Sequence, residues 1–280
     1  MIYKKLDNSS VSVHIENKDN SDPYTAIGNK AFLSCKDVYE IKLPDTICKI
    51  GDWAFAHMKE LKKIIVPSNE ISIGRDAFLD CNNLVEIVIY PDDSKNKGLP
   101  YLLASCITYL NVYDLLDFKM AAVSNEKWCE KYDTELLRFI SLPDDNGFQP
   151  FIVGWFNDEG EEEQLNNYIE KKKLDKLKLC FLRLKYNTCL GQETSNQLIS
   201  YIKTQLECTD ADCSGWKLFR DELSDDIQYV KTAVENNIID AELKLEIIKA
   251  INKRNGNPEI SAYLLSLEEE RESIEQQFKL

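Results

Sequence analysis

Short segments that alternate apolar and polar residues recur at a constant interval in the first third of the chain. They read VYEIKLP (38–44), LKKIIVP (61–67) and LVEIVIY (84–90). Alternation with a period of two is typical of strands that bury one face. The residues predicted to point into a core are Ile41, Leu43, Ile64, Val66, Ile87 and Ile89.

A second motif recurs at the same interval, before each of these strands. It reads IGNKAFLSC (27–35), IGDWAFAHM (50–58) and IGRDAFLDC (73–81). The glycine of each copy predicts a turn with an unusual backbone angle. The phenylalanine of each copy is predicted to enter the core from the side opposite the strand. Two motifs in register over three copies predict a solenoid, in which each repeat buries its apolar face on its neighbours.

These motifs resemble the BspA-like, or treponemal-type, leucine-rich repeat family, whose pattern reads roughly IGxxAFxxCxxLxxIxLPxxVxx. The resemblance covers residues 27–91, with Met58 in place of a cysteine and Tyr90 in place of a proline. It implies a curved ladder of short strands used for protein contacts, often on the surface of anaerobic bacteria or parasites.

The repeat phase predicts the domain organisation of an α+β repeat protein. A leucine-rich repeat domain is expected over residues 1–98, with repeats near 27–49, 50–72 and 73–95. Residues 1–26 are predicted to cap its N-terminal end, because Val11, Val13 and Ile15 alternate as a strand.

After Pro100 the apolar residues follow a helical period, which predicts an all-α domain over residues 99–280. Its expected architecture is ankyrin-like, another α-solenoid, or a compact bundle. The segment NGNPEISAYLL (255–265) looks like the second half of an ankyrin-type helix pair, although the ankyrin opening Thr-Pro-Leu-His does not occur. The region also resembles the helical tails that follow such repeats in gut-type anaerobic bacteria.

The spacing predicts twelve helices, and Asp133, Ser224 and Asp240 are expected to cap three of them. The predicted ranges are 99–109, 112–123, 125–131, 133–140, 147–155, 161–171, 173–185, 193–206, 215–222, 224–236, 240–253 and 258–266.

The strand phase also selects the residues that face outward, on the concave side that the resemblance implies. They form two columns across the sheet and are Glu40, Lys42, Lys63, Ile65, Glu86 and Val88. Ile65 and Val88 are neighbouring apolar residues on an outward face, and such patches usually mark a contact. Either the chain's own helical half or terminal segment covers them, or a protein partner does.

The charge argues against a nucleic-acid partner. The chain holds 34 Lys and Arg against 48 Asp and Glu, for a formal net charge of −14. Residues 1–100 carry 13 basic and 15 acidic residues, so most of the acidity belongs to the rest. An acidic surface repels phosphate backbones. The longest uncharged stretch, residues 98–113, is too short and too polar to span a membrane.

Cysteine usage and the first residues favour a cytoplasmic location. Nine cysteines without a CxxC pair indicate reduced thiols in a chain of 280 residues. The opening MIYKKLDNSSVSV lacks the apolar run of a signal peptide. The alternative is the cell surface, if a signal peptide has been removed.

No catalytic residue, cofactor or metal is expected. The only two histidines are His14, in the cap strand, and His57, at a repeat position shared with Ser34 and Asp80. Nucleotide-binding loops and zinc patterns do not occur. The segment DADCSG (210–215) is an imperfect calcium loop, because Lys217 and Asp221 occupy positions that need an apolar residue and glutamate. A polar interhelical loop is the preferred interpretation, and cation binding there stays open.

The sequence therefore predicts a non-enzymatic module that binds a protein partner through the concave sheet, the helical surface or both. One alternative is a cell-surface adhesin of an anaerobic bacterium that binds host proteins. A weaker alternative is an enzyme with a pocket at the domain junction. The identity of the partner and the oligomeric state stay open.

Overall fold

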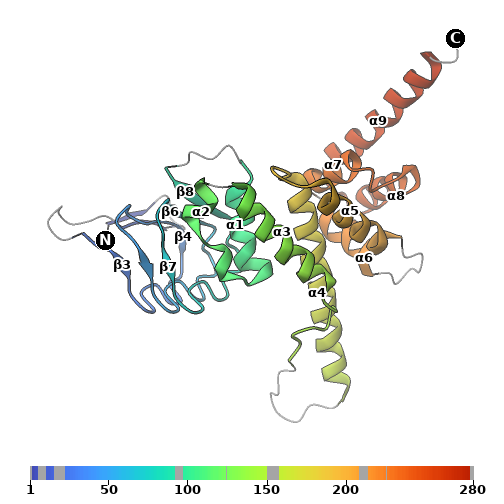
Figure 1. The fold of residues 1–280 in the computed structure, drawn as a ribbon. Helices are drawn as coiled ribbons and strands as arrows, with labels where there is room; N and C mark the ends of the chain where they lie inside the picture. The colour runs from blue at the N-terminus through green and yellow to red at the C-terminus, as the bar shows by residue number, and fades with distance from the viewer. Residues whose placement is uncertain are drawn as a thin grey trace. The chain divides into compact units, whose positions relative to one another are not determined.

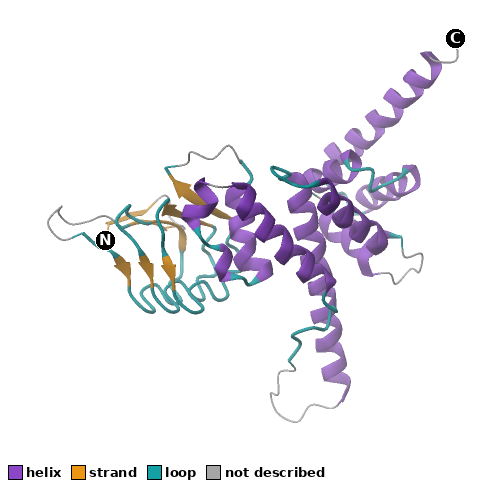
Figure 2. Cartoon of the chain, viewed as in Figure 1, coloured by secondary structure: helices purple, strands orange, loops and turns teal. Residues whose placement is uncertain are grey.

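The computed structural model describes residues 2–5, 11–15, 23–91, 97–123, 125–149, 158–207, 214–224 and 226–277. The chain forms two compact units. The first contains residues 1–139 and 186–190, and the second contains residues 140–185 and 191–280. The first unit combines strands and helices, whereas the described elements of the second are helices (Figures 1 and 2).

The larger sheet of the first unit has the strand order β1-β2-β4-β6-β8. Strand β1 runs antiparallel to β2, and the other pairs are parallel. The strand bounds are Ile2–Lys5 (β1), Val11–His14 (β2), Val38–Lys42 (β4), Lys63–Pro67 (β6) and Glu86–Tyr90 (β8). Strands β4, β6 and β8 are the three predicted repeat strands, and β2 is the predicted cap strand.

A second, three-stranded parallel sheet has the order β3-β5-β7, with bounds Ala26–Ile27, Lys49–Ile50 and Ser72–Ile73. The phenylalanine rings of the three repeats stack on one another and are buried. The ring centroids of Phe32 and Phe55 are 5.5 Å apart, and those of Phe55 and Phe78 are 5.2 Å apart. On the strand side Ile41, Ile64 and Ile87 have no exposed surface. The solenoid core is therefore built as the repeat phase predicts.

The turns that carry the AF motif also pair with one another through their backbones. The Phe32 N–H donates to the Ala54 carbonyl at 2.7 Å, and the Phe55 N–H donates to the Ala77 carbonyl at 2.8 Å. Each turn thus donates hydrogen bonds to the next one along the chain. This ladder adds a third line of contact between repeats, beside the two sheets.

The prediction that the repeat glycines adopt unusual backbone angles is wrong. None of them has a positive φ. A Cβ atom at Gly51 would lie 2.6 Å from the Asn29 backbone nitrogen, and one at Gly74 would lie 2.5 Å from the Asp52 nitrogen. The stacked turns approach so closely that only glycine fits. At Gly28, which begins the first repeat, a Cβ would meet nothing within 4 Å.

The left-handed backbone falls instead on two other positions of each turn. One is occupied by Lys30, Trp53 and Asp76, with φ of 57°, 53° and 52°. The other is occupied by Ser34, His57 and Asp80, with φ of 55°, 58° and 57°. Residues with side chains rarely adopt such angles. The repeated stacking contacts hold all six residues in this conformation.

Helices follow the last repeat within the same compact unit. They are α1 (Leu99–Ser105), η1 (Cys106–Leu110), η2 (Tyr113–Leu115), α2 (Phe118–Val123) and α3 (Asn125–Ser141). Helix α1 packs against β8 (Figure 1). The Tyr113 hydroxyl is hydrogen bonded to the Phe78 backbone, and burial raises its pKa to about 12. The predicted division at residue 98 marks the change from strands to helices, but the compact unit continues to Phe139.

The second unit contains a long helix, α4, against which α5, α6 and α7 pack. Its elements are α4 (Asp158–Lys185), α5 (Gln192–Leu206), α6 (Ser214–Leu218), η3 (Phe219–Leu223), α7 (Ile227–Glu235), α8 (Ala241–Lys253) and α9 (Pro258–Gln277). The Phe181 ring lies at the centre, 5.5 Å from Phe219 and 5.7 Å from Tyr229. The coarse prediction of a helical region after the repeats is confirmed.

Several finer helix predictions are wrong. The pairs 125–131 and 133–140, and 161–171 and 173–185, are each one continuous helix. Asp133 consequently lies inside α3 and not at the start of a helix. Ser224 ends η3 instead of beginning a helix, and the Asp226 carboxylate caps α7. The Asp240 cap is confirmed, since its carboxylate accepts a hydrogen bond from the Leu243 N–H at 2.9 Å. Among the described residues, no helix has the length and apolar character needed to cross a membrane.

Candidate interaction surface

The strand register brings the six predicted outward residues together in two columns. Strand pairing places Lys63 between Glu40 and Glu86, and Ile65 between Lys42 and Val88. All six are half-buried, whereas the residues that alternate with them are buried. We call the surface formed by Glu40, Lys42, Lys63, Ile65, Glu86 and Val88 the sheet face.

The first column is a polar row whose members bond to one another. The Lys63 Nζ and the Glu86 Oε2 are 3.3 Å apart, and the Ser12 hydroxyl donates to Glu40 at 3.3 Å. Glu86 also bonds Tyr101 of α1, and burial together with this carboxylate raises the pKa of Tyr101. The Tyr101 ring stacks on Tyr186 with centroids 4.9 Å apart. The polar row therefore satisfies much of its own charge.

The second column is mainly apolar and continues to Tyr90, which is 56% exposed. The Lys42 Nζ lies 5.1 Å from the centroid of the Tyr90 ring. Lys42 is on β4 and Tyr90 is on β8, so the lysine side chain crosses the intervening strand β6, where Ile65 lies. Long lysine stems cover apolar surface in this way while the ammonium stays in water. The aliphatic stem of Lys42 thus shields part of the apolar column.

Three further exposed apolar residues lie on or beside the repeat strands, outside the predicted set. Tyr39 and Val85 are 39% and 52% exposed at the start of the repeat strands, and Lys62 lies 5.4 Å from the Tyr39 ring. Tyr90 has the same outward phase as Glu86 and Val88, so the alternation rule could have found it. Tyr39 and Val85 precede the regular alternation, and nothing in the period marks them as exposed.

The turns carry a second row of exposed side chains on the left-handed positions. The Lys30 Nζ lies 4.6 Å from the Trp53 ring, and the indole N–H of Trp53 donates to Asp76 at 3.0 Å. These contacts follow one another from repeat to repeat. They stabilise the turn ladder from its solvent side.

Ser34, His57 and Asp80 occupy the same position in consecutive repeats and are the residue types of a hydrolytic triad. The His57 Nδ1 lies 2.9 Å from the Asp80 Oδ2, on side chains that are 42% and 50% exposed. Between the described atoms of Ser34 and His57 no hydrogen bond forms, and a serine nucleophile requires one. The pair is best described as a surface contact. The side chain of His14 lies outside the described residues.

The described residues contain no group of three or more metal-ligating side chains from histidine, cysteine, aspartate and glutamate. Residues 210–213 of the imperfect calcium loop lie outside the described residues. The seven described cysteines are free thiols. Burial raises the pKa of Cys81 to about 12, which keeps this thiol protonated and unreactive at neutral pH.

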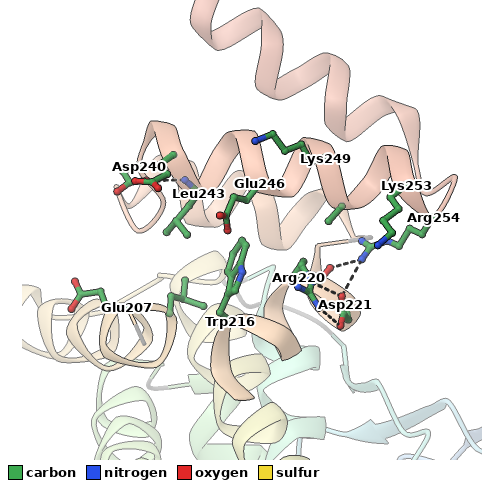
Figure 3. Close-up of a pocket in the computed structure, with 13 residues that line it drawn as sticks. Glu207, Trp216, Arg220, Asp221, Asp240, Leu243, Glu246, Lys249, Lys253 and Arg254 are labelled. Atoms are coloured by element: carbon green, nitrogen blue, oxygen red, sulfur yellow. Dashed lines mark hydrogen bonds and ion pairs between the residues drawn. The ribbon is translucent and has the colours of Figure 1, made fainter. Parts of the chain in front are cut away.

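The second unit contains a groove of about 960 Å³ between α8 and the segment formed by the end of α5, α6 and η3 (Figure 3). Trp216 stands in its middle. The Arg220 guanidinium donates to both Asp221 oxygens, at 2.7 and 2.8 Å, and these bonds lower the pKa of Asp221. Arg254 donates to Ser224 at 2.9 Å. All residues that line the groove belong to the second unit, so it is not the pocket expected at the domain junction.

The comparison with known families bears on the first unit alone. Residues 10–114 match the family model described as BspA type Leucine rich repeat region (6 copies). The match contains the cap strand, the three repeats and α1, and it extends beyond the segment 27–91 on which the resemblance rests. Leucine-rich repeats are generally protein-interaction modules. No curated protein and no solved structure matches the chain.

Proposed function

We propose that the chain is a non-enzymatic protein-binding module and that its partner binds the sheet face. The observation that carries this proposal is the apolar column, in which Ile65 and Val88 adjoin the exposed ring of Tyr90. Exposed apolar surface rimmed by polar residues marks sites of protein contact. The match to BspA-type repeats supports the same function.

The two columns contribute to partner recognition in different ways. The polar row already contains an ion pair between Lys63 and Glu86. It therefore aligns a partner on the sheet face more than it adds to the binding affinity. The apolar column offers area that a partner can bury, with a tyrosine of the kind that is enriched in binding hot spots. Lys42 forms no ion pair with a described carboxylate. A partner that presents an apolar side chain next to a carboxylate therefore fits this surface.

We further propose that the helical unit is ankyrin-like. The supporting observation is that α8 and α9 pack against each other as a helix pair, joined by the tight turn over residues 254–257. Stacked helix pairs would give the chain a second surface for protein contact.

Photo-crosslinking tests the sheet face directly. A benzoyl-phenylalanine placed at position 65 should crosslink one partner from an extract of the source cells. The same probe at position 79 should not, because Leu79 is 37% exposed on a turn, away from the strands. Equal crosslinking from both positions would contradict the proposal.

Substitution provides the second arm of this experiment. Ile65→Asp should abolish capture of the crosslinked partner, whereas Leu79→Asp should leave it unchanged. Thermal unfolding of both variants shows whether each is folded. A folded Ile65→Asp variant that still binds its partner would show that the sheet face is not the binding site.

A further inference from the structure

Four charged residues of α8 form a single stripe. Glu242, Glu246, Lys249 and Lys253 follow one another at spacings of four, three and four residues, which places them on one face of a helix. All four are exposed and border the groove. The opposite face carries Ile247 and Ile251, which are buried. Figure 3 shows Glu246, Lys249 and Lys253 along this helix.

The chain itself explains only part of the order of these charges. The helix dipole favours acids in the first turn and bases in the last, which accounts for Glu242 and Lys253. The dipole effect falls off within one turn, so it does not account for Glu246 and Lys249. These two form an oppositely charged pair three residues apart, and Glu246 also acts electrostatically on Arg220 across the groove. Both like-charged pairs are four residues apart, a spacing that destabilises a helix. Neither Lys249 nor Lys253 forms an ion pair with a described residue.

The stripe is symmetric about the midpoint between Ile247 and Ile248. It reads acid, acid, base, base, and a half-turn about this midpoint exchanges the acids with the bases. When two copies of the helix lie antiparallel, Glu242 therefore faces Lys253 and Glu246 faces Lys249.

We propose that α8 pairs antiparallel with α8 of a second copy of this chain, forming a two-fold dimer. Such an interface is self-complementary, since each contact occurs twice. The two-fold pairing turns the stripe into four ion pairs. The antiparallel arrangement also opposes the two helix dipoles.

The expected dimer is weak and depends on salt. Helix α8 has 13 residues, and a contact between two such helices is smaller than a standard protein interface. Exposed ion pairs are screened by salt. The dimer should therefore form at high protein concentration and low ionic strength, and dissociate when salt is added.

Charge exchange tests this pairing with the full chain. Glu242→Lys with Glu246→Lys makes the stripe basic, and Lys249→Glu with Lys253→Glu makes it acidic. By sedimentation velocity, each variant alone should dimerise at least roughly tenfold more weakly than the wild type, because every facing pair becomes repulsive. An equimolar mixture of the two should recover a dimer. Circular dichroism checks that both variants keep their helix content.

Two single substitutions provide the matched control. Lys249→Glu should weaken the dimer, and Lys217→Glu should not, because Lys217 is exposed on α6 outside the stripe. Equal effects of the two substitutions would overturn the proposal, as would a mixture no more dimeric than its components. A wild-type chain that stays monomeric at low salt would also overturn it. Capture of a different protein's helix by α8 in that case would assign the stripe to another partner.

Discussion

The ammonium of Lys42 lies 5.1 Å from the centre of the Tyr90 ring, across the strand that separates them in the sheet. This contact keeps a lysine stem over the apolar column and leaves the tyrosine ring open to solvent. A partner that binds there displaces a flexible lysine stem, which costs less than opening a packed core. The Lys42 stem thus shields part of the sheet face without closing it.

Tyr90→Ala tests the importance of this ring. We expect the affinity for the crosslinked partner to fall by about 1–3 kcal/mol, because buried tyrosines are common hot spots. The melting temperature should change little, since the ring is 56% exposed in the free chain. Isothermal titration and thermal unfolding measure the two effects. An unchanged affinity would remove Tyr90 from the binding site.

The repeat glycines provide a matched set of stability variants. Gly51→Ala and Gly74→Ala should each lower the free energy of unfolding by about 2–4 kcal/mol, because the new Cβ meets backbone atoms of the preceding turn. Gly28→Ala should have a small effect, since its Cβ would lie in open space. Urea titrations compare the three variants. Equal losses at all three positions would show that close stacking is not the reason for glycine.

The phenylalanine stack predicts a graded series. Phe55 has a ring on each side, so Phe55→Ala should cost about 3–5 kcal/mol of unfolding free energy. Phe32 stacks on one side only, and Phe32→Ala should cost less. Chemical denaturation followed by tyrosine and tryptophan fluorescence measures both. The reverse order would contradict a stack held by ring contacts on both faces.

The buried thiol of Cys81 predicts a dependence on alkaline pH. Its pKa is raised from 9.0 to about 12 in the folded chain, so above pH 9 the unfolded chain releases a proton that the folded chain keeps. The stability that the protonated thiol contributes is therefore lost as the pH rises from 9 toward 12. Compared with Cys81→Ala, the wild type should lose on the order of 2 kcal/mol more between pH 9 and 11. Parallel urea titrations at each pH give this difference, and equal losses would show that the thiol is not buried in solution.

Lys176 forms a buried ion pair in the helical unit. Its Nζ lies 2.6 Å from the Asp144 Oδ1 and also donates to the Leu142 carbonyl at 2.5 Å. Asp144→Asn should cost about 3–5 kcal/mol of unfolding free energy, because it leaves the buried ammonium of Lys176 without its counter-ion. Lys176→Met removes the buried charge itself and should cost less, since the Asp144 side chain is 26% exposed and its carboxylate reaches water. Thermal unfolding ranks the two variants, and the reverse order would contradict a buried ammonium that depends on Asp144.

The repeat strands could be predicted from the sequence because their burial follows a local rule. An alternation with a period of two and a constant repeat length place Ile64 inside and Ile65 outside without further information. The role of Gly51 could not be predicted in this way, since it depends on how closely the preceding turn approaches. The local pattern predicts that the glycine is needed for an unusual backbone angle. It is needed instead because the preceding repeat lies too close for a side chain.

The helical unit was less predictable for a related reason. Asp133 is a good capping residue by type, yet α3 continues through it because apolar residues on both sides pack into one core. The groove beside α8 joins residues from α5, α6, η3 and α8. The helical period of the sequence predicts each of these helices separately. It does not show which helices pack against one another.

The turn ladder gives the repeat stack a direction. Each turn donates its backbone N–H groups toward the following turn, as Phe32 does to Ala54, and accepts from the preceding one. The two ends of the stack therefore differ chemically, and at the late end the Phe78 backbone meets the Tyr113 hydroxyl. A further repeat of the same length could be inserted between two others. It would donate hydrogen bonds to the following turn and accept them from the preceding turn. The same pattern of donors and acceptors thus fits a stack of any length, and the last turn keeps its contact with Tyr113.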